Sequence, residues 1–154
     1  MNFGQLRHRI VLMKKRGFTR NSMSEEVPTF EVYHPGYNLI VVYEDRDEQG
    51  GICWRIKSDE SHEFSENADV VYADTLEHSK YAFRAEVKPT TGREYEEMQK
   101  IRAETTYSVH MRFLPGLTHD MFILHNDKQL NIESILDIGE RHKELTVVCS
   151  EVQR

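Results

Sequence analysis

Evenly spaced strand-like runs in the C-terminal half constrain the fold of this 154-residue chain more than any other feature. Apolar and polar residues alternate within each run, and turn-forming residues separate the runs, a pattern that predicts half-buried strands. Strands at such short and regular intervals are typical of a small β-barrel or sandwich. The runs are Tyr81–Lys88, Thr105–Phe113, Met121–Ile138 as a hairpin, and Leu145–Val152.

The N-terminal half predicts a first strand and an inserted hairpin. Alternation in Phe3–Lys14 places Leu6, His8, Ile10 and Leu12 on one face and Arg7, Arg9, Val11 and Met13 on the other. Further strands are expected at Val27–Tyr33, Tyr37–Glu44 and Ile52–Lys57, with the charged turn Glu44–Gly51 closing a hairpin. Arg16–Glu26 and Ser58–Asn67 have loop composition, Ala68–Ala73 fits a short strand or a helix start, and Asp74–Ser79 reads as a connection.

One short helix is predicted at Glu94–Ala103, where acids occupy the first turn and Tyr95 and Met98 share a face. The expected class is therefore a mostly β fold, a small β-barrel or sandwich with one short helix and an inserted β-hairpin. The length fits a single domain over residues 1–154, with the insertion at about 18–79.

The charge is distributed unevenly along the chain. Residues 1–20 carry six basic groups and no acid, residues 21–86 carry fifteen acids against five bases, and residues 87–154 carry eleven acids against nine bases. An acidic middle argues against a protein that grips phosphates over a broad surface. The basic stretch Arg7–Arg20 could contact phosphate or dock on an acidic neighbouring subunit, and docking is the favoured interpretation.

No pattern in the sequence predicts catalysis, a metal or a cofactor. Asp45–Ile56 resembles a calcium loop at its first and third positions and at Gly50, but Ile56 stands where a bidentate Glu is required, so a charged hairpin turn is expected. The eight histidines lack zinc-site spacing, and Gly50-Gly51 lacks the Lys of a phosphate loop. Cys53 and Cys149 are expected to be reduced, partly buried thiols.

Aromatic residues recur at period-two spacing in the predicted strands, where core packing is the usual role. They could instead stack nucleobases, which keeps a nucleic-acid-binding β-barrel module as the alternative function. Trp54 fits either a core position or an interface anchor. The residues are Tyr81, Phe83, Tyr107, Phe113 and Phe122. With no apolar run near about 20 residues and charge interleaved in Leu6–Ile10, neither a membrane span nor a signal peptide is expected, and synthesis is expected in the cytoplasm.

An ordered series of short motifs runs through both ends of the chain. They are Gly4–Ile10, Tyr81–Val87, Thr91–Glu94 with a Gly-x-Glu, Tyr107–Phe113, Thr118–Met121, Leu130–Asp137, and Arg141, Leu145 and Cys149–Glu151. The series resembles the head–tail joining family of tailed bacteriophages, also called head-closure or stopper proteins. The resemblance is interrupted by Phe18–Ser79. This segment is much longer than the short connection that the family has at this place.

The resemblance implies a structural virion protein, not an enzyme. Such proteins form a ring, commonly of about six or twelve copies, between the portal or adaptor ring and the tail or tail-terminator protein. Double-stranded DNA passes through the lumen without sequence-specific binding, and the expected location is the neck of the virion. The polar segment between two strands is the expected channel-facing element, through Thr91, Gly92, Arg93, Glu94, Glu96, Glu97 and Lys100. Subunit or ring contacts are expected at Arg7, Arg9, Trp54 and Arg112.

Overall fold

The computed structural model describes residues 6–37, 40–57, 70–89, 106–137, 139 and 141–152. This part of the chain holds ten strands and one short helix. The strands are β1 (His8–Arg20), β2 (Glu26–Tyr33), β3 (Val41–Arg46), β4 (Ile52–Ile56), β5 (Val70–Val71), β6 (Phe83–Pro89), β7 (Thr106–Arg112), β8 (Met121–His125), β9 (Lys128–Asp137) and β10 (Glu144–Glu151), and the helix is α1 (Ala73–Glu77). The predicted mostly β class is confirmed.

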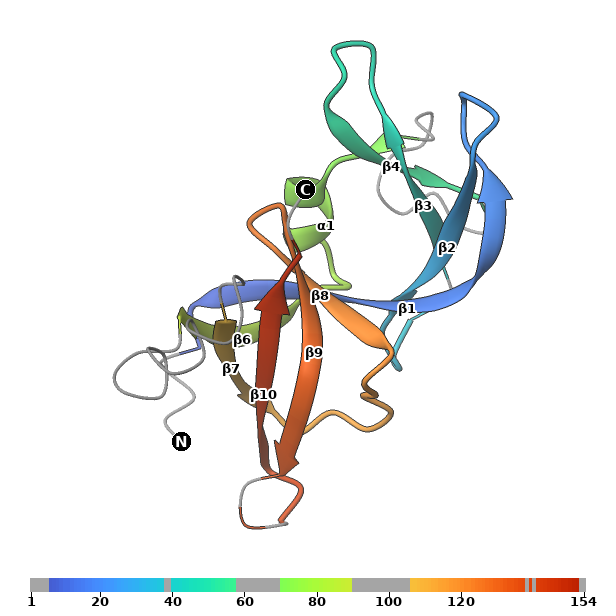
Figure 1. Cartoon of the computed structure of the whole chain (residues 1–154). Helices are drawn as coiled ribbons and strands as arrows, with labels where there is room; N and C mark the ends of the chain where they lie inside the picture. The colour runs from blue at the N-terminus through green and yellow to red at the C-terminus, as the bar shows by residue number, and fades with distance from the viewer. Residues whose placement is uncertain are drawn as a thin grey trace.

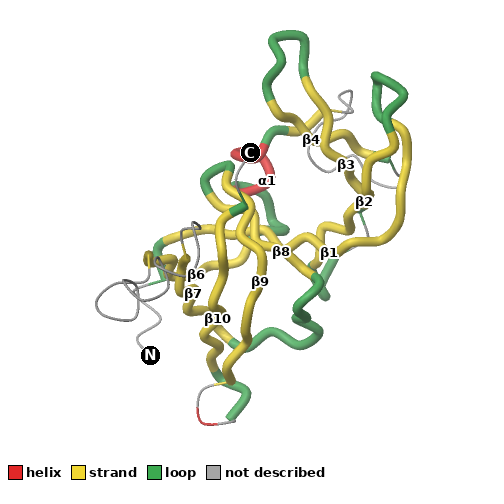
Figure 2. The backbone as a smooth tube through the Cα atoms, in the orientation of Figure 1, coloured by secondary structure: helices red, strands yellow, loops and turns green. Residues whose placement is uncertain are grey.

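Six strands pair in a closed circuit (Figures 1 and 2). β1 pairs with β6, β6 with β7, β7 with β10, β10 with β9, β9 with β8, and β8 returns to β1, all antiparallel. The circuit contains every strand predicted in the C-terminal half, together with the predicted first strand. Closure covers strand edges that would otherwise offer unpaired backbone groups to another chain.

The remaining strands extend from the far half of β1. Residues Leu12–Arg20 of β1 pair with β2, and β3, β4 and β5 follow in order across the sheet. The β1–β2 and β3–β4 hairpins of this extension project away from the closed circuit (Figure 1). The inserted hairpin that the sequence predicted is therefore present as β3–β4, and it belongs to a larger extension that also contains β2.

Two hydrophobic cores lie on opposite faces of β1 and β8. Ile10 and Leu12 enter the core inside the circuit, whereas Val11 and Met13 enter the core under the extension and α1. All four side chains are fully buried. Burial of one such side chain contributes about 1.5–3 kcal/mol, so this short run stabilises both cores at once. The uninterrupted apolar run is the pattern of a strand covered on both faces.

The loop predicted at Arg16–Glu26 is wrong in its first half. β1 continues to Arg20 and pairs with β2 through Arg20↔Glu26, with an irregularity between Lys15 and Gly17. Apart from Gly17 and Phe18, the residues here have polar side chains, because the strand has left both cores and its residues are mostly exposed or half-buried. The backbone hydrogen bonds to β2, not burial, keep this stretch extended.

The helix prediction at Glu94–Ala103 lies outside the described residues. The helix that the structure shows, α1, begins at Ala73, the end of the Ala68–Ala73 stretch predicted as a short strand or a helix start, and β5 lies in the same stretch. The rest of α1 occupies residues predicted as a connection. Leu76 is fully buried and Ala73 is 7% exposed, so α1 covers the second core. The hairpin predicted at Met121–Ile138 is present as β8–β9, and Asn126 and Asp127 in its turn both adopt positive φ.

Candidate functional site

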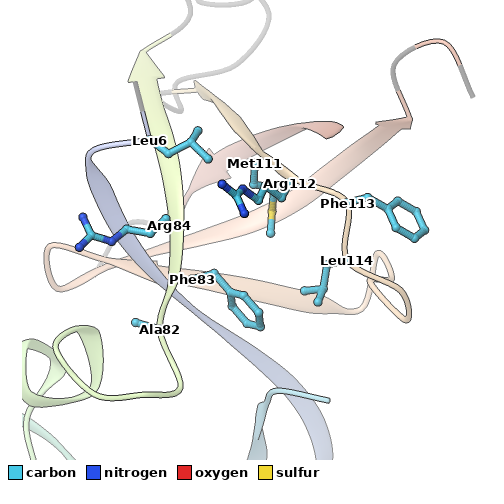
Figure 3. A pocket seen from close by; sticks show the side chains of 8 residues that line it. All are labelled: Leu6, Ala82, Phe83, Arg84, Met111, Arg112, Phe113 and Leu114. Atoms are coloured by element: carbon cyan, nitrogen blue, oxygen red, sulfur yellow. The ribbon is translucent and has the colours of Figure 1, made fainter. Parts of the chain in front are cut away.

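A groove opens at one end of the closed circuit, between the start of β6 and the end of β7 (Figure 3). Its volume is about 520 Å³, and its lining is mainly apolar with two arginines. Phe83 and Leu114 point toward one another in it, and the Arg84 guanidinium extends away from them (Figure 3). The lining residues are Leu6, Ala82, Phe83, Arg84, Met111, Arg112, Phe113 and Leu114.

Arginines gather at the rim of this groove because of strand register. Arg9 of β1 lies directly opposite Arg84 of β6, and Arg112 of β7 lies opposite Glu144 of β10. Like charges in directly opposed positions destabilise a sheet. Among the described residues, no carboxylate forms an ion pair with Arg9 or Arg84. Arg84 and Arg112 line the groove, and Arg9, which is not part of the lining, places a further positive charge opposite Arg84.

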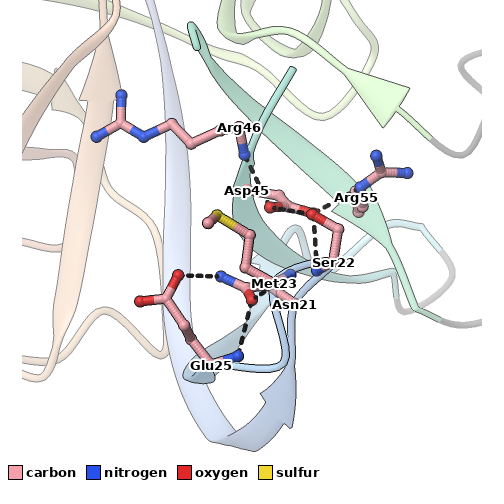
Figure 4. Close-up of polar contacts among 7 residues, drawn as sticks. All are labelled: Asn21, Ser22, Met23, Glu25, Asp45, Arg46 and Arg55. Carbon is pink, nitrogen blue, oxygen red and sulfur yellow. Dashed lines mark hydrogen bonds and ion pairs between the residues drawn. The ribbon is translucent and has the colours of Figure 1, made fainter. Parts of the chain in front are cut away.

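A second feature joins the two projecting hairpins through the buried carboxylate of Asp45 (Figure 4). Arg55 Nε donates to Asp45 Oδ2 at 2.7 Å, within the β3–β4 hairpin. The Ser22 hydroxyl, in the turn of the β1–β2 hairpin, donates to Asp45 Oδ1 at 3.0 Å. One carboxylate thus fixes the turn of one hairpin against the neighbouring hairpin.

The pKa of Asp45 lies below its ordinary value. Burial acts to raise this pKa, but hydrogen bonds from the Arg46 backbone N–H, the Arg55 side chain and Ser22 outweigh it. The charged form is therefore the stable one in the folded chain. Asp47, the other carboxylate of the calcium-like segment, accepts from the Gly51 N–H at 2.7 Å and from the Tyr72 hydroxyl at 3.0 Å. The charged hairpin turn predicted for this segment is confirmed.

Apolar side chains are exposed on the β1–β2 hairpin. Phe18 is 56% exposed and Met23 is 70% exposed, in a hairpin that otherwise presents charged residues. The Lys15 ammonium lies 5.0 Å from the centre of the Phe18 ring. Exposed apolar groups on a projecting element are common in protein contacts.

A buried polar cluster joins α1 to the circuit. The Asn126 N–H donates to Glu77 Oε1, and His125 Nδ1 lies 4.0 Å from the same oxygen. His125 Nδ1 also lies 2.9 Å from the Arg9 carbonyl oxygen and donates to it. Burial raises the pKa of Glu77 and lowers the pKa of His125, since a charge is poorly solvated there.

The structure separates the residues predicted as ring contacts. Arg7 and Arg112 are exposed and Arg9 is half-exposed, all near one end of the circuit. Trp54 is 1% exposed and packs in the second core, so the core role is the correct one of its two predicted roles and no indole is presented to a neighbour. The residues predicted to face the channel lie outside the described residues; they are Thr91, Gly92, Arg93, Glu94, Glu96, Glu97 and Lys100.

The aromatic residues occupy the core positions expected of them. Tyr81 and Phe122 are buried in the second core, and Phe83, Tyr107 and Phe113 pack against the first. Cys53 and Cys149 are free thiols, as predicted, and both are fully buried where only partial burial was expected. Among the residues described, no cluster of His, Cys, Asp and Glu has the arrangement of a metal site.

Sequence analysis did not single out Arg84 as a contact residue. Its position between Phe83 and Ala85 is an ordinary outward position in a strand. Only the register between β1 and β6 shows that Arg84 and Arg9 occupy directly opposed positions. A single sequence carries no signal for that pairing, because the two residues are far apart in the chain.

A family model for phage structural proteins, described as phage head completion protein, matches residues 57–152. The chain belongs to this family, and this confirms the resemblance to head-closure proteins. The match covers five of the six strands in the circuit, while β1, which closes it, lies outside the matched range. No curated protein matches the chain significantly. Within the described residues, no helix is long and apolar enough to span a membrane.

Proposed function

We propose that the chain is a subunit of a ring in the phage neck, where it joins the portal or adaptor ring of the DNA-filled head to the tail. The observation that carries this proposal is the family match over residues 57–152. A head completion protein acts on a filled head, and the exit of the head is where the tail must attach. A structural protein, not an enzyme, fits this role.

The shape of the subunit supports ring assembly. A ring repeats one heterologous interface, so each copy needs two different faces on a body that holds its form. The closed circuit supplies such a body, and the projecting hairpins fixed by Asp45 supply a distinct face. Arg7, Arg9 and Arg112, at the groove end of the circuit, are proposed contacts with a neighbouring subunit or with a neighbouring ring. The ring would contain about six or twelve copies.

The segment Thr91–Lys100 is the proposed channel-facing element. β6 ends at Pro89 and β7 begins at Thr106, and Pro89 pairs directly with Tyr107. The chain between them therefore leaves and returns at one place on the circuit. Glu94, Glu96 and Glu97 would repel the DNA backbone, so DNA could pass without being held.

Two experiments test the proposal at different levels. Imaging of purified virions should show density for this chain between the portal and the tail, and density elsewhere would contradict the neck assignment. Deletion of Glu94–Glu97 should leave assembly intact and let DNA leak from filled heads. The matched control replaces Glu94, Glu96 and Glu97 by Gln, which keeps the length. Full retention of DNA in the deletion would refute channel closure by this segment.

A further inference from the structure

We propose that the groove between β6 and β7 binds an extended acidic segment of a partner protein, with apolar side chains in the groove and carboxylates on the arginines at its rim. That the partner is a neighbouring virion protein rests on the proposed function. The chemistry of the groove stands without it.

The lining of the groove favours apolar side chains. Its volume of about 520 Å³ falls within the range of roughly 300–1,000 Å³ that ligand sites occupy. Phe83 and Leu114 point toward one another (Figure 3), and Met111, which also lines the groove, packs in the first core. A partner side chain placed here would add apolar contact to an existing core.

The charge at the rim selects an acidic partner. Arg9 and Arg84 are directly opposite one another, and among the described residues neither has an ion-pair partner. The repulsion between them would be relieved by a carboxylate that bridges both guanidinium groups. Arg112 lies beside the groove as well and is opposite Glu144, so its charge is already partly balanced.

An extended peptide can satisfy both features at once. In a strand, successive side chains point to opposite faces, so apolar residues at every second position can enter the groove. Acidic residues that flank this apolar stretch would reach Arg84, whose guanidinium extends away from Phe83 and Leu114 (Figure 3). Duplex DNA fits less well, because its phosphates cannot enter an apolar groove and the chain has a net charge of −6. The observations therefore favour a protein segment.

Binding to the full-length chain is measured with a fluorescein-labelled, acetylated peptide of alternating glutamate and leucine. A peptide with lysine in place of glutamate is the chemical control, and a duplex DNA oligonucleotide is the second probe. Arg84→Glu should weaken binding of the acidic peptide about tenfold, the effect expected for loss of a charge-assisted contact. Lys57→Glu, which changes the net charge equally at an exposed site away from the groove, should leave binding unchanged.

Thermal unfolding separates lost recognition from lost folding. Arg84→Glu places a carboxylate opposite Arg9 and should raise the melting temperature, because it replaces a repulsive pair by an attractive one. Loss of peptide binding in a stabilised variant supports the proposal. Equal binding by both variants, no binding of the acidic peptide by the wild type, or Arg84-dependent binding of DNA alone would each overturn it. Arg84-dependent self-association without peptide binding would assign the groove to a second copy and overturn it too.

The peptide experiment and the virion experiments test separate claims, so a negative result in one leaves the other claim standing. Peptide binding is measured on the isolated chain, so its absence refutes the groove proposal and leaves the neck assignment intact. A position outside the neck refutes the proposed function and leaves peptide binding as measured.

Discussion

Arg55 Nε lies 2.7 Å from Asp45 Oδ2 across the β3–β4 hairpin, and the same carboxylate accepts from Ser22 in the β1–β2 turn. Because the Asp45 side chain is only 1% exposed, removal of the carboxylate leaves its donors unpaired. Asp45→Ala should lower the free energy of unfolding by about 3 kcal/mol, measured by urea denaturation. Glu48→Ala, in the exposed turn of the same hairpin, should change it by less than about 0.5 kcal/mol.

Acid should weaken the same contact. The pKa of Asp45 is depressed from its ordinary value of 3.8, since hydrogen bonds to the charged form outweigh the effect of burial. Its contribution is therefore present above about pH 3.8 and is lost as the pH falls through the folded-state pKa. The Asp45→Asn variant should lack this part of the acid sensitivity. An unchanged pH profile in that variant would contradict the assignment.

Gly116 is expected to tolerate no side chain. It has a φ of +84°, and an added Cβ would meet the Tyr33 hydroxyl, which donates to the Pro115 carbonyl oxygen. Gly116→Ala should cost about 2–3 kcal/mol of stability. Gly50 has a φ of +81° with open space around it, so Gly50→Ala should cost only about 1 kcal/mol from backbone strain. Equal losses in the two variants would show that the contact with Tyr33 is unimportant.

The Glu77–His125 cluster should make stability depend on pH in two opposite directions. The pKa of Glu77 is raised, so the folded chain keeps a proton that the unfolded chain releases above about pH 4.5. The contribution of Glu77 to the free energy of unfolding therefore becomes unfavourable as the pH rises. Glu77→Gln removes the charge and keeps an oxygen for the Asn126 N–H. This variant should be more stable than the wild type at pH 8.

The lowered pKa of His125 has the reverse effect. Below about pH 6.5 the unfolded chain binds a proton that the folded chain excludes, so stability falls as the pH decreases. His8 of β1 and Lys128 of β9 face the ring as well and disfavour the same proton. This fall in stability at low pH should be clearest in the Glu77→Gln variant. It should be absent from the double variant that carries both Glu77→Gln and His125→Asn. Calorimetric melting between pH 5 and pH 8 measures both effects.

The two cysteines should be unreactive in the folded chain. Both side chains are fully buried, burial raises the pKa of Cys53, and burial raises the pKa of Cys149 to about 12. A thiol reagent at pH 8 should label neither until denaturant is added, since the thiolate is the reactive form. Gln49→Cys, at an exposed turn position, provides a fast-reacting control. Rapid labelling of the native wild type would contradict the packing described for these residues.

The strand series of the C-terminal half could be predicted because its signal is local. Turn residues such as Asn126 and Asp127 mark the hairpins, and period-two alternation marks strands with one buried face. The same alternation rule misled at the end of β1. Lys15–Arg20 carries a single large apolar side chain, the exposed Phe18, and only its pairing with β2 reveals it as a strand.

The candidate site was only partly predictable. Arg9 and Arg112 were named from sequence, and both lie at the groove end of the circuit. The partnership of Arg9 with Arg84 could not be predicted, because it depends on the register between strands distant in sequence. Trp54 was open to two roles, and burial under the extension decided between them.

β1 belongs to both the circuit and the projecting hairpin, and β8 and β2 flank its middle residues. Val11–Lys14 is held by β8 along its length, with antiparallel partners at every position. A pull on the hairpin along the axis of β1 would load these hydrogen bonds in shear, so that they resist together instead of opening one by one. The strand is thereby a mechanical tether, suited to carry tension from whatever grips the hairpin into the body of the subunit.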